Sequence, residues 1–371
     1  MSGFTWRMLV AATALFCGAA AARAEIIIGT AGPMQGQYAA LGEQIRRGAQ
    51  QAVDDINATG GINGEQLVLK VADDSCDPRK AVEVANQFVS QGVKFVAGHY
   101  CSGSSIPASK IYDNAGIVEI SPASTLPKYT DDGGWNVLRT CARDDAQGSA
   151  AGLLIASKFA GRKIAIVADQ APANAALAAK VKAALNAKGV TETFFENYTA
   201  GAKDYGELAL KLSDGLVDVV YFAGAYPEAG LILKELRDLG RIVQMISGDS
   251  LVTEEFWNVA GDAGEGTLMT FTPDPLTIVA AQSLIQRFKD AGYTPEGYTL
   301  HAYAAVQAYV QAAEATGGMD GRKIAQWLRA GNRVNSAIGE LSFDALGDVR
   351  DPQFTWLRWS QGKFAVATDL P

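Results

Sequence analysis

The 371-residue chain is poor in the residue types that catalysis and metal binding require. It holds only two histidines, His99 and His301, which excludes a histidine-rich metal site. No P-loop, G-x-G-x-x-G after the first strand, G-x-S-x-G elbow or H-E-x-x-H motif is present. Asp73, Asp74 and Asp77 lack the spacing and glycine of a calcium loop, so a strand end, a turn and a helix start explain them better. We therefore expect no catalytic residue, no metal and no cofactor.

Positive charge is also in deficit, with 32 Lys and Arg against 40 Asp and Glu, and this argues against nucleic acid as a partner. Long apolar runs are absent after residue 24. At the N-terminus, Arg7 precedes the apolar run Met8 to Phe16, and Ala22-Arg23-Ala24 is a small-x-small cleavage site. These features predict a signal peptide over residues 1–24. A membrane anchor is the alternative, but the run is shorter than the roughly 20 residues that span a bilayer.

Three cysteines follow the predicted signal peptide: Cys76, Cys101 and Cys141. In an oxidising compartment, Cys76 and Cys101 can close a loop of about 25 residues, which would stabilise the fold by about 3 kcal/mol. Cys141 would then be free. Three buried thiols remain the alternative, because spacing alone does not prove a bridge.

Strand and helix patterns alternate along the chain, and its length predicts two compact units. The first series contains predicted strands at 26–28, 67–72 and 93–97, with predicted helices around 41–56 and over 78–90. The second contains predicted strands at 164–168, 217–222, 243–246 and 267–271, with predicted helices at 175–188 and 227–239. Further helices are expected at 280–289 and 298–315. This order predicts an α/β fold with two parallel sheets, each covered by helices on both faces.

Hydroxyl-rich segments follow two strands of the first series. Gly98 to Pro107 contains Ser102 and Ser104 at a helix start, where unpaired N–H groups can hold an anion. Simple N-capping by either serine is the alternative. A second such strand end, Ser121 to Thr125, favours a ligand site, because the carboxyl ends of parallel strands face the ligand crevice. In the second series Asp249 follows a strand, as a ligand group or a turn residue. An anion cradle opposite one carboxylate would bind a zwitterion.

These segments resemble the Leu/Ile/Val-binding family, the type I periplasmic substrate-binding proteins of branched-chain amino-acid ABC transporters. The resemblance covers essentially the whole chain after residue 24, and its most specific part is GHYCSGSSIPASKIY, residues 98–112. The other segments that carry it are 29–62, 73–78, 113–125, 138–148, 226–228 and 339–348. It implies two lobes joined by a three-segment hinge, with lobe 1 formed by 25–143 plus 274–348 and lobe 2 by 144–273 plus 349–371.

The resemblance also implies roles for individual residues. Ser102 and Thr125 would bind the ligand carboxylate, while the Ala123 carbonyl and the Asp249 carboxylate would bind the ammonium. Ser124 lies within the same segment and is included among the predicted ligand contacts. The family has a disulfide that matches Cys76 and Cys101.

The chain departs from the family where the pocket walls are expected. Leu41, Ala173 and Ala225 stand where branched-chain binders carry tyrosines, and Tyr100 replaces an aliphatic residue. Tyr226 either compensates as a ligand contact or packs against lobe 2. His301 either lines the cleft or is a core histidine. The zwitterion site is therefore expected to be kept, while its specificity surface is altered.

We expect a periplasmic, monomeric substrate-binding protein that passes a branched-chain or related small L-amino acid to an inner-membrane ABC permease. The alternative is a periplasmic sensor of an amino acid, γ-aminobutyrate or an amide that signals to a receptor. Both functions use closure of the lobes around the ligand.

Overall fold

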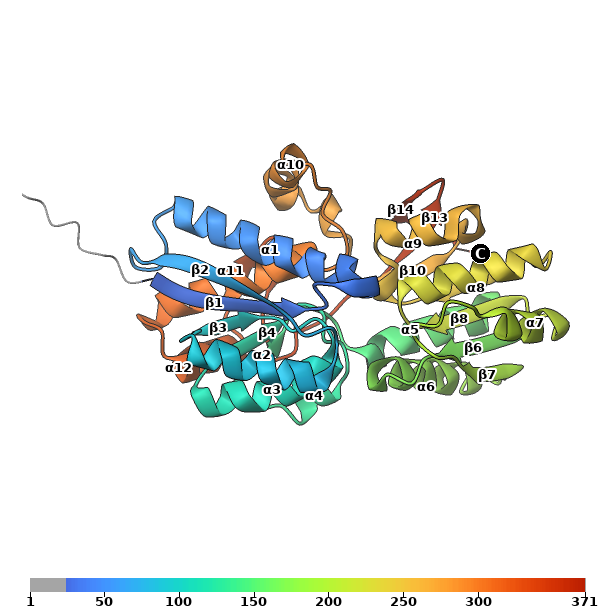
Figure 1. The fold of residues 1–371 in the computed structure, drawn as a ribbon, viewed down its shortest axis with the longest axis horizontal. Coiled ribbons are helices and arrows are strands. Elements are labelled where there is room, and N and C mark those ends of the chain that lie inside the picture. The colour runs from blue at the N-terminus through green and yellow to red at the C-terminus, as the bar shows by residue number, and fades with distance from the viewer. Residues whose placement is uncertain (1–24, 371) are drawn as a thin grey trace, which may run out of the picture.

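The computed structural model describes residues 25–370, which form two α/β lobes side by side along the long axis of the molecule (Figure 1). The predicted signal peptide lies outside the described residues. Lobe 1 contains a five-stranded sheet of strand order β2-β1-β3-β4-β5, and lobe 2 a seven-stranded sheet of order β14-β13-β10-β9-β8-β6-β7. The predicted α/β fold with two mostly parallel sheets is confirmed.

All neighbouring strands of the lobe 1 sheet are parallel. The strands are β1 (Glu25–Gly32), β2 (Gln66–Asp73), β3 (Phe95–Ala97), β4 (Val118–Ser121) and β5 (Val137–Arg139). The helices of this lobe are α1 (Ala39–Ala58), α2 (Pro78–Ser90), α3 (Ser102–Ala115), α4 (Lys128–Asp131), α10 (Gln282–Asp290), α11 (Thr299–Thr316) and α12 (Gly321–Arg329). A hairpin of β11 (Val334–Ser336) and β12 (Gly339–Leu341) follows α12. The late helices α10 to α12 thus return to the core beside β1 and β3.

Each face of the lobe 1 sheet packs against its own helices, because successive side chains of a strand point to opposite faces. In β3, Phe95 and Ala97 pack with α11, while Val96 packs with α2 and α3. The helices α1 and α11 approach closely at Gly48, where a Cβ atom would lie 2.0 Å from the Thr299 carbonyl oxygen. Figure 1 shows α1 and α11 together, away from α2 and α3.

The lobe 2 sheet has five parallel strands and an antiparallel pair at one edge. The strands are β6 (Ile164–Ala168), β7 (Phe194–Asn197), β8 (Val219–Ala223), β9 (Gln244–Ser247), β10 (Leu268–Phe271), β13 (Thr355–Ser360) and β14 (Lys363–Val366). The helices are α5 (Asp144–Lys158), α6 (Pro172–Asn186), α7 (Gly206–Asp214), α8 (Tyr226–Asp238) and α9 (Glu254–Ala260). Helices α5 and α6 cover one face of the sheet, and α7 to α9 cover the other.

Three chain segments connect the sheets: one between β5 and α5, one after β10 and one before β13. Buried Arg139 lies 2.7 Å from Asp348, which also pairs with Arg143 at 2.8 Å, so the first and third segments are tied by charge. The first and second segments meet at His301, whose carbonyl accepts from Thr140 at 3.0 Å. Its Nε2 lies 3.0 Å from the Thr272 hydroxyl. His301 is therefore buried at the hinge. This agrees with the alternative that it is a core histidine.

Candidate functional site

A cavity of about 690 Å³ lies between the lobes and is the candidate site. Its volume is within the range of small-molecule sites. Lobe 1 contributes the turn after β2, the start of α3 and the loop after β4, and lobe 2 contributes the loops after β6, β8 and β9. The cavity thus lies at the carboxyl ends of parallel strands, where open α/β sheets bind their ligands.

The first turn of α3 forms one wall. Cys101, not Ser102 or Ser104, is the N-cap residue, and it makes no side-chain cap bond, so the capping alternative is wrong. Ser102 is the first helical residue, and its N–H has no intrahelical acceptor by position. The Ser102 hydroxyl accepts from the Leu126 N–H at 3.2 Å, which leaves its proton available to a ligand. Ser102 therefore presents two donors to the cavity that it lines.

A disulfide between Cys76 and Cys101 fixes the start of this helix. The bridge joins the turn after β2 to the N-cap of α3, and both cysteines line the cavity. The predicted pairing is confirmed, and the alternative of three thiols is wrong. Cys141 is free and buried, and burial raises the pKa of its thiol.

A buried polar chain lies behind the disulfide. His99 Nδ1 is 2.6 Å from Asp74 Oδ2, and its Nε2 is 2.9 Å from the Tyr112 hydroxyl. Asp74 also accepts from the Cys76 N–H at 2.8 Å. Asp77 caps α2 by accepting from the N–H groups of Arg79 and Lys80. These contacts give Asp74 and Asp77 the structural roles expected from the sequence, and the described residues hold no group of three potential metal ligands.

The loop after β4 forms the neighbouring wall, where Ala123 and Thr125 line the cavity. Ser121 donates to the His99 carbonyl at 2.6 Å and accepts from the Ser124 N–H at 2.9 Å. Arg139 donates to the carbonyls of Ser124 at 2.6 Å and Leu126 at 3.1 Å. The loop is therefore held by a hinge residue, with the partly exposed Thr125 between the two bonds.

Asp249 lies on the lobe 2 side, two residues after the end of β9. Its carboxylate accepts from the Tyr298 hydroxyl at 2.7 Å and from Gln147 Nε2 at 3.1 Å. Gln147 is fixed in turn by the Thr270 hydroxyl at 2.9 Å. Burial raises the pKa of Asp249, and the bonds from Tyr298 and Gln147 oppose that rise. Because Tyr298 precedes α11 of lobe 1, this carboxylate is bonded to both lobes and lines the cavity between them.

Asp144, the first residue of α5, is a cavity residue that sequence reasoning missed. Its side chain is buried, and Oδ2 has no hydrogen-bond partner within residues 25–370. Burial raises the pKa of Asp144 to about 7, and the Asp249 carboxylate adds to the rise, while Thr125 and Arg139 oppose it. The sequence offers a weak signal, since Asp144 follows the hinge strand within a stretch that carries the family resemblance.

The remaining predicted residues divide between the cavity and its surroundings. Tyr100 lines the cavity, and its ring lies edge-on to Tyr298 at 5.8 Å. The Tyr100 hydroxyl is buried with no partner in the described chain. Ser124 and Tyr226 are not lining residues: the Ser124 hydroxyl lies 2.7 Å from that of Ser105, and Tyr226 donates to the Gln37 carbonyl at 2.6 Å. Tyr226 thus bonds across the cleft to lobe 1, which neither of its predicted alternatives states.

The altered wall positions, Leu41, Ala173 and Ala225, all line the cavity. Near them, the Tyr38 hydroxyl donates to Glu228 of lobe 2 at 2.9 Å. Alanine at 173 and 225 leaves space that larger side chains would fill, so the cavity is widened on its lobe 2 side.

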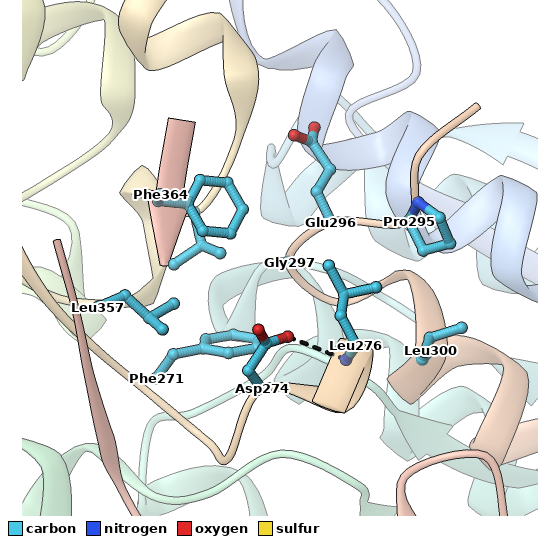
Figure 2. A pocket seen from close by; sticks show the side chains of 10 residues that line it. Phe271, Asp274, Leu276, Pro295, Glu296, Gly297, Leu300, Leu357 and Phe364 are labelled. Carbon is cyan, nitrogen blue, oxygen red and sulfur yellow. Dashed lines mark hydrogen bonds between the residues drawn. The ribbon is translucent and has the colours of Figure 1, made fainter. Parts of the chain in front are cut away.

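A second, much smaller pocket lies at the hinge and is shown in Figure 2. Phe271, Leu357 and Phe364 come from lobe 2, Glu296 comes from the segment before α11, and Leu300 comes from α11 itself. Asp274 accepts from the Leu276 N–H at 2.9 Å, the dashed line in Figure 2. A volume of about 10 Å³ holds one water molecule at most, which excludes this pocket as the ligand site.

Hydroxyl and N–H groups in one lobe, a carboxylate in the other and a cavity between them are the arrangement of a two-lobed protein that binds a small molecule. The chain belongs to the periplasmic binding protein family, whose model matches residues 25–356. The family resemblance drawn from the sequence is confirmed. Between residues 25 and 370, none of the helices has the length and apolarity needed to cross a membrane.

Named relatives cover nearly the whole chain. The Leu/Ile/Val-binding protein homolog 1 of Brucella melitensis is 43% identical over 353 residues, 95% of each chain. An ABC transporter substrate-binding protein of Desulfitobacterium hafniense, solved with Leu, has a TM-score of 0.76 and 28% identity, covering 93% of this chain and all of that one. The branched-chain amino acid transporter substrate-binding protein LivJ of Streptococcus pneumoniae, solved with isoleucine, has a TM-score of 0.84 and 24% identity, covering 93% and 99%.

Proposed function

We propose that this protein captures a free L-amino acid, branched-chain or related, in the periplasm and delivers it to an inner-membrane ABC permease. One observation carries the proposal: Ser102 and Thr125 of lobe 1 and Asp249 of lobe 2 line the same cavity. Donors on one side and a carboxylate on the other match the two charges of a zwitterion. The relatives are named as binding proteins and transporter components, which favours uptake over sensing.

The ligand carboxylate would accept from the Ser102 hydroxyl, the Ser102 N–H and Thr125. The ammonium would donate to the Ala123 carbonyl and to Asp249. Asp249 is prepared for this role, because Tyr298 and Gln147 already orient its carboxylate. We assign Ser124 to holding the loop that carries Thr125, since its hydroxyl is hydrogen-bonded to the Ser105 hydroxyl and to the Tyr100 carbonyl.

The ligand side chain would lie against Tyr100, Leu41, Ala173 and Ala225, which line the rest of the cavity. Leucine, isoleucine and valine are the first candidates, because relatives are named for them. A cavity of about 690 Å³ with two alanines in its wall also has room for a larger side chain.

The proposal includes a monomer without catalytic activity, divided into lobes at residues 143/144, 273/274 and 348/349. Sheet membership supports this division, since β6 to β10, β13 and β14 share one sheet. Ligand would close the lobes by contacts made only in the closed state. The Tyr226–Gln37 and Tyr38–Glu228 bonds join the two lobes and would break if the lobes moved apart.

The test is isothermal titration calorimetry on protein that has been unfolded, stripped of ligand and refolded. The titrants are the common L-amino acids, γ-aminobutyrate and small amides. One-to-one binding of an L-amino acid supports the proposal, and loss of its uptake on gene deletion supports delivery to a permease. Heat from no zwitterion would refute capture, and unchanged uptake would refute delivery.

A further inference from the structure

Resting on the proposed function, we propose that Asp144 is a second acidic contact for the ammonium group of the ligand. Asp249, which lines the cavity and is oriented by Tyr298 and Gln147, is the first acidic contact in the proposed function. Asp144 lies on another element, at the start of α5, and lines the same cavity.

Among the acidic residues that line the cavity, Asp144 is distinguished by its hydrogen bonding. Oδ2 is buried and has no partner among the described residues, although an unpaired buried polar atom is costly. Asp169, another acidic residue of the cavity wall, is by contrast satisfied by the Ala171 N–H at 2.8 Å and by Asn174 at 2.9 Å. The unpaired oxygen of Asp144 therefore needs a donor that the protein does not supply.

An ammonium group is the donor that best fits this place. The charged residues that line the cavity are Asp144, Asp169, Asp249 and Lys128, so negative charge is in excess. The Asp144 N–H donates to the Thr125 carbonyl at 3.0 Å, which places the carboxyl beside the residue proposed to bind the zwitterion. A cation between Asp144 and Asp249 would relieve the repulsion between these two carboxylates.

The same placement makes ligand binding depend on pH. Four groups face Asp144 and influence its ionisation: Asp249 after β9, Arg139 of β5, Thr125 after β4 and Asp145 of its own helix. The Asp144 carboxyl also faces Tyr221 of β8. With a pKa of about 7, Asp144 is largely protonated at pH 5.5, and an arriving ammonium would favour its ionised form. Binding should then release a proton and strengthen as pH rises.

The expected size follows from the ionised fraction, which rises from about 3% at pH 5.5 to about 90% at pH 8 for a pKa of about 7. If only the ionised form contacts the ammonium, affinity should increase about 30-fold over this range. The ammonium and carboxylate of a free α-amino acid keep their charges between these pH values, so the change belongs to the protein.

Calorimetry would test this with L-leucine, L-isoleucine, L-valine and L-phenylalanine at pH 5.5 and 8.0, in two buffers of different ionisation enthalpy. We expect proton release with the wild type and a pH dependence reduced to less than about 3-fold in Asp144→Asn. Asp214→Asn is the control, since Asp214 is an exposed acidic residue at the end of α7 and is not a lining residue. It should keep the wild-type pH dependence.

The desamino analogue 4-methylpentanoate makes the test independent of any variant's folding. Wild-type protein should release a proton with L-leucine, or with whichever of the four amino acids binds, and none with the analogue lacking the ammonium. Equal proton release with and without the ammonium, or equal pH dependence in wild type and Asp144→Asn, would overturn the role of Asp144. Absence of any amino-acid binding at both pH values would instead refute the proposed function.

Discussion

Replacing Asp249 by alanine should weaken amino-acid binding more than any other single change at the cavity. The substitution removes the carboxylate that Tyr298 and Gln147 hold in the cavity wall. It would leave the ammonium of the proposed ligand without its main counter-charge, in a cavity that lies between the two lobes. Breaking a buried charge pair by removing one partner costs about 3–5 kcal/mol.

The lower end of that range applies here, because Asp144 would still face the ammonium. Loss of the repulsion from Asp249 would also favour ionisation of Asp144, so part of the lost attraction would be replaced. About 3 kcal/mol corresponds to an affinity loss of about 100-fold. Asp249→Asn should lose nearly as much, because an amide keeps the shape and an acceptor but not the charge.

The measurement is titration calorimetry at pH 7.5, with L-leucine as the first titrant and the other L-amino acids if leucine does not bind. Asp214→Asn is the control, since Asp214 is an exposed acidic residue of the same lobe. Thermal unfolding of each variant would show that the fold is kept. A dissociation constant within twofold of wild type for Asp249→Ala, at full binding stoichiometry, would remove Asp249 from the site.

Three further predictions concern the bridge, the hinge and the pocket wall. Cys76→Ser should lower the free energy of unfolding in urea by about 3 kcal/mol through the loss of a 25-residue loop closure, and a reductant should have the same effect on the wild type. Burial lowers the pKa of His301 to about 3. As the pH falls, the unfolded chain therefore binds a proton at this histidine before the folded protein does. The free energy of unfolding should decrease by about 1.4 kcal/mol per pH unit from pH 6.5 downward. In denaturant titrations His301→Asn should lose this contribution, and an equal slope in both proteins would contradict it. Ala225→Tyr should reduce binding of L-phenylalanine far more than of L-valine, and equal losses would show that Ala225 does not limit ligand size.

Much of the fold could be predicted from local patterns. The predicted helix over residues 78–90 and the predicted strand over 164–168 have the observed bounds, because each carries its own signals. Asp77 caps the helix and Pro78 occupies its first turn, and the strand is a run of apolar residues that is buried on both faces. The strands β7, β13 and β14 were not predicted, since these strands at or next to the sheet edges are only partly apolar and depend on their neighbours.

The site could be predicted in part, for a related reason. Ser102, Thr125 and Asp249 follow strands, and the rule that ligands bind at the carboxyl ends of parallel strands places them in one crevice. Asp144 follows a strand too, but it reads as an ordinary acidic residue in the first turn of a helix. Its burial depends on the packing of α5 against lobe 2, and that is not visible in a single sequence.

The polar and apolar parts of the site differ in how freely they can change. The proposed zwitterion contacts depend on backbone placed by strand ends, by the first turn of α3 and by Arg139, which also ties the hinge to Asp348. A change in that backbone would disturb the fold as well as the proposed ligand site. The walls at 41, 173 and 225 are side chains that face a cavity, so each can shrink or grow without moving the backbone. Ligand identity can therefore change in this fold while the proposed zwitterion site persists, and the wall residues, more than overall similarity to leucine binders, should decide which amino acid is bound.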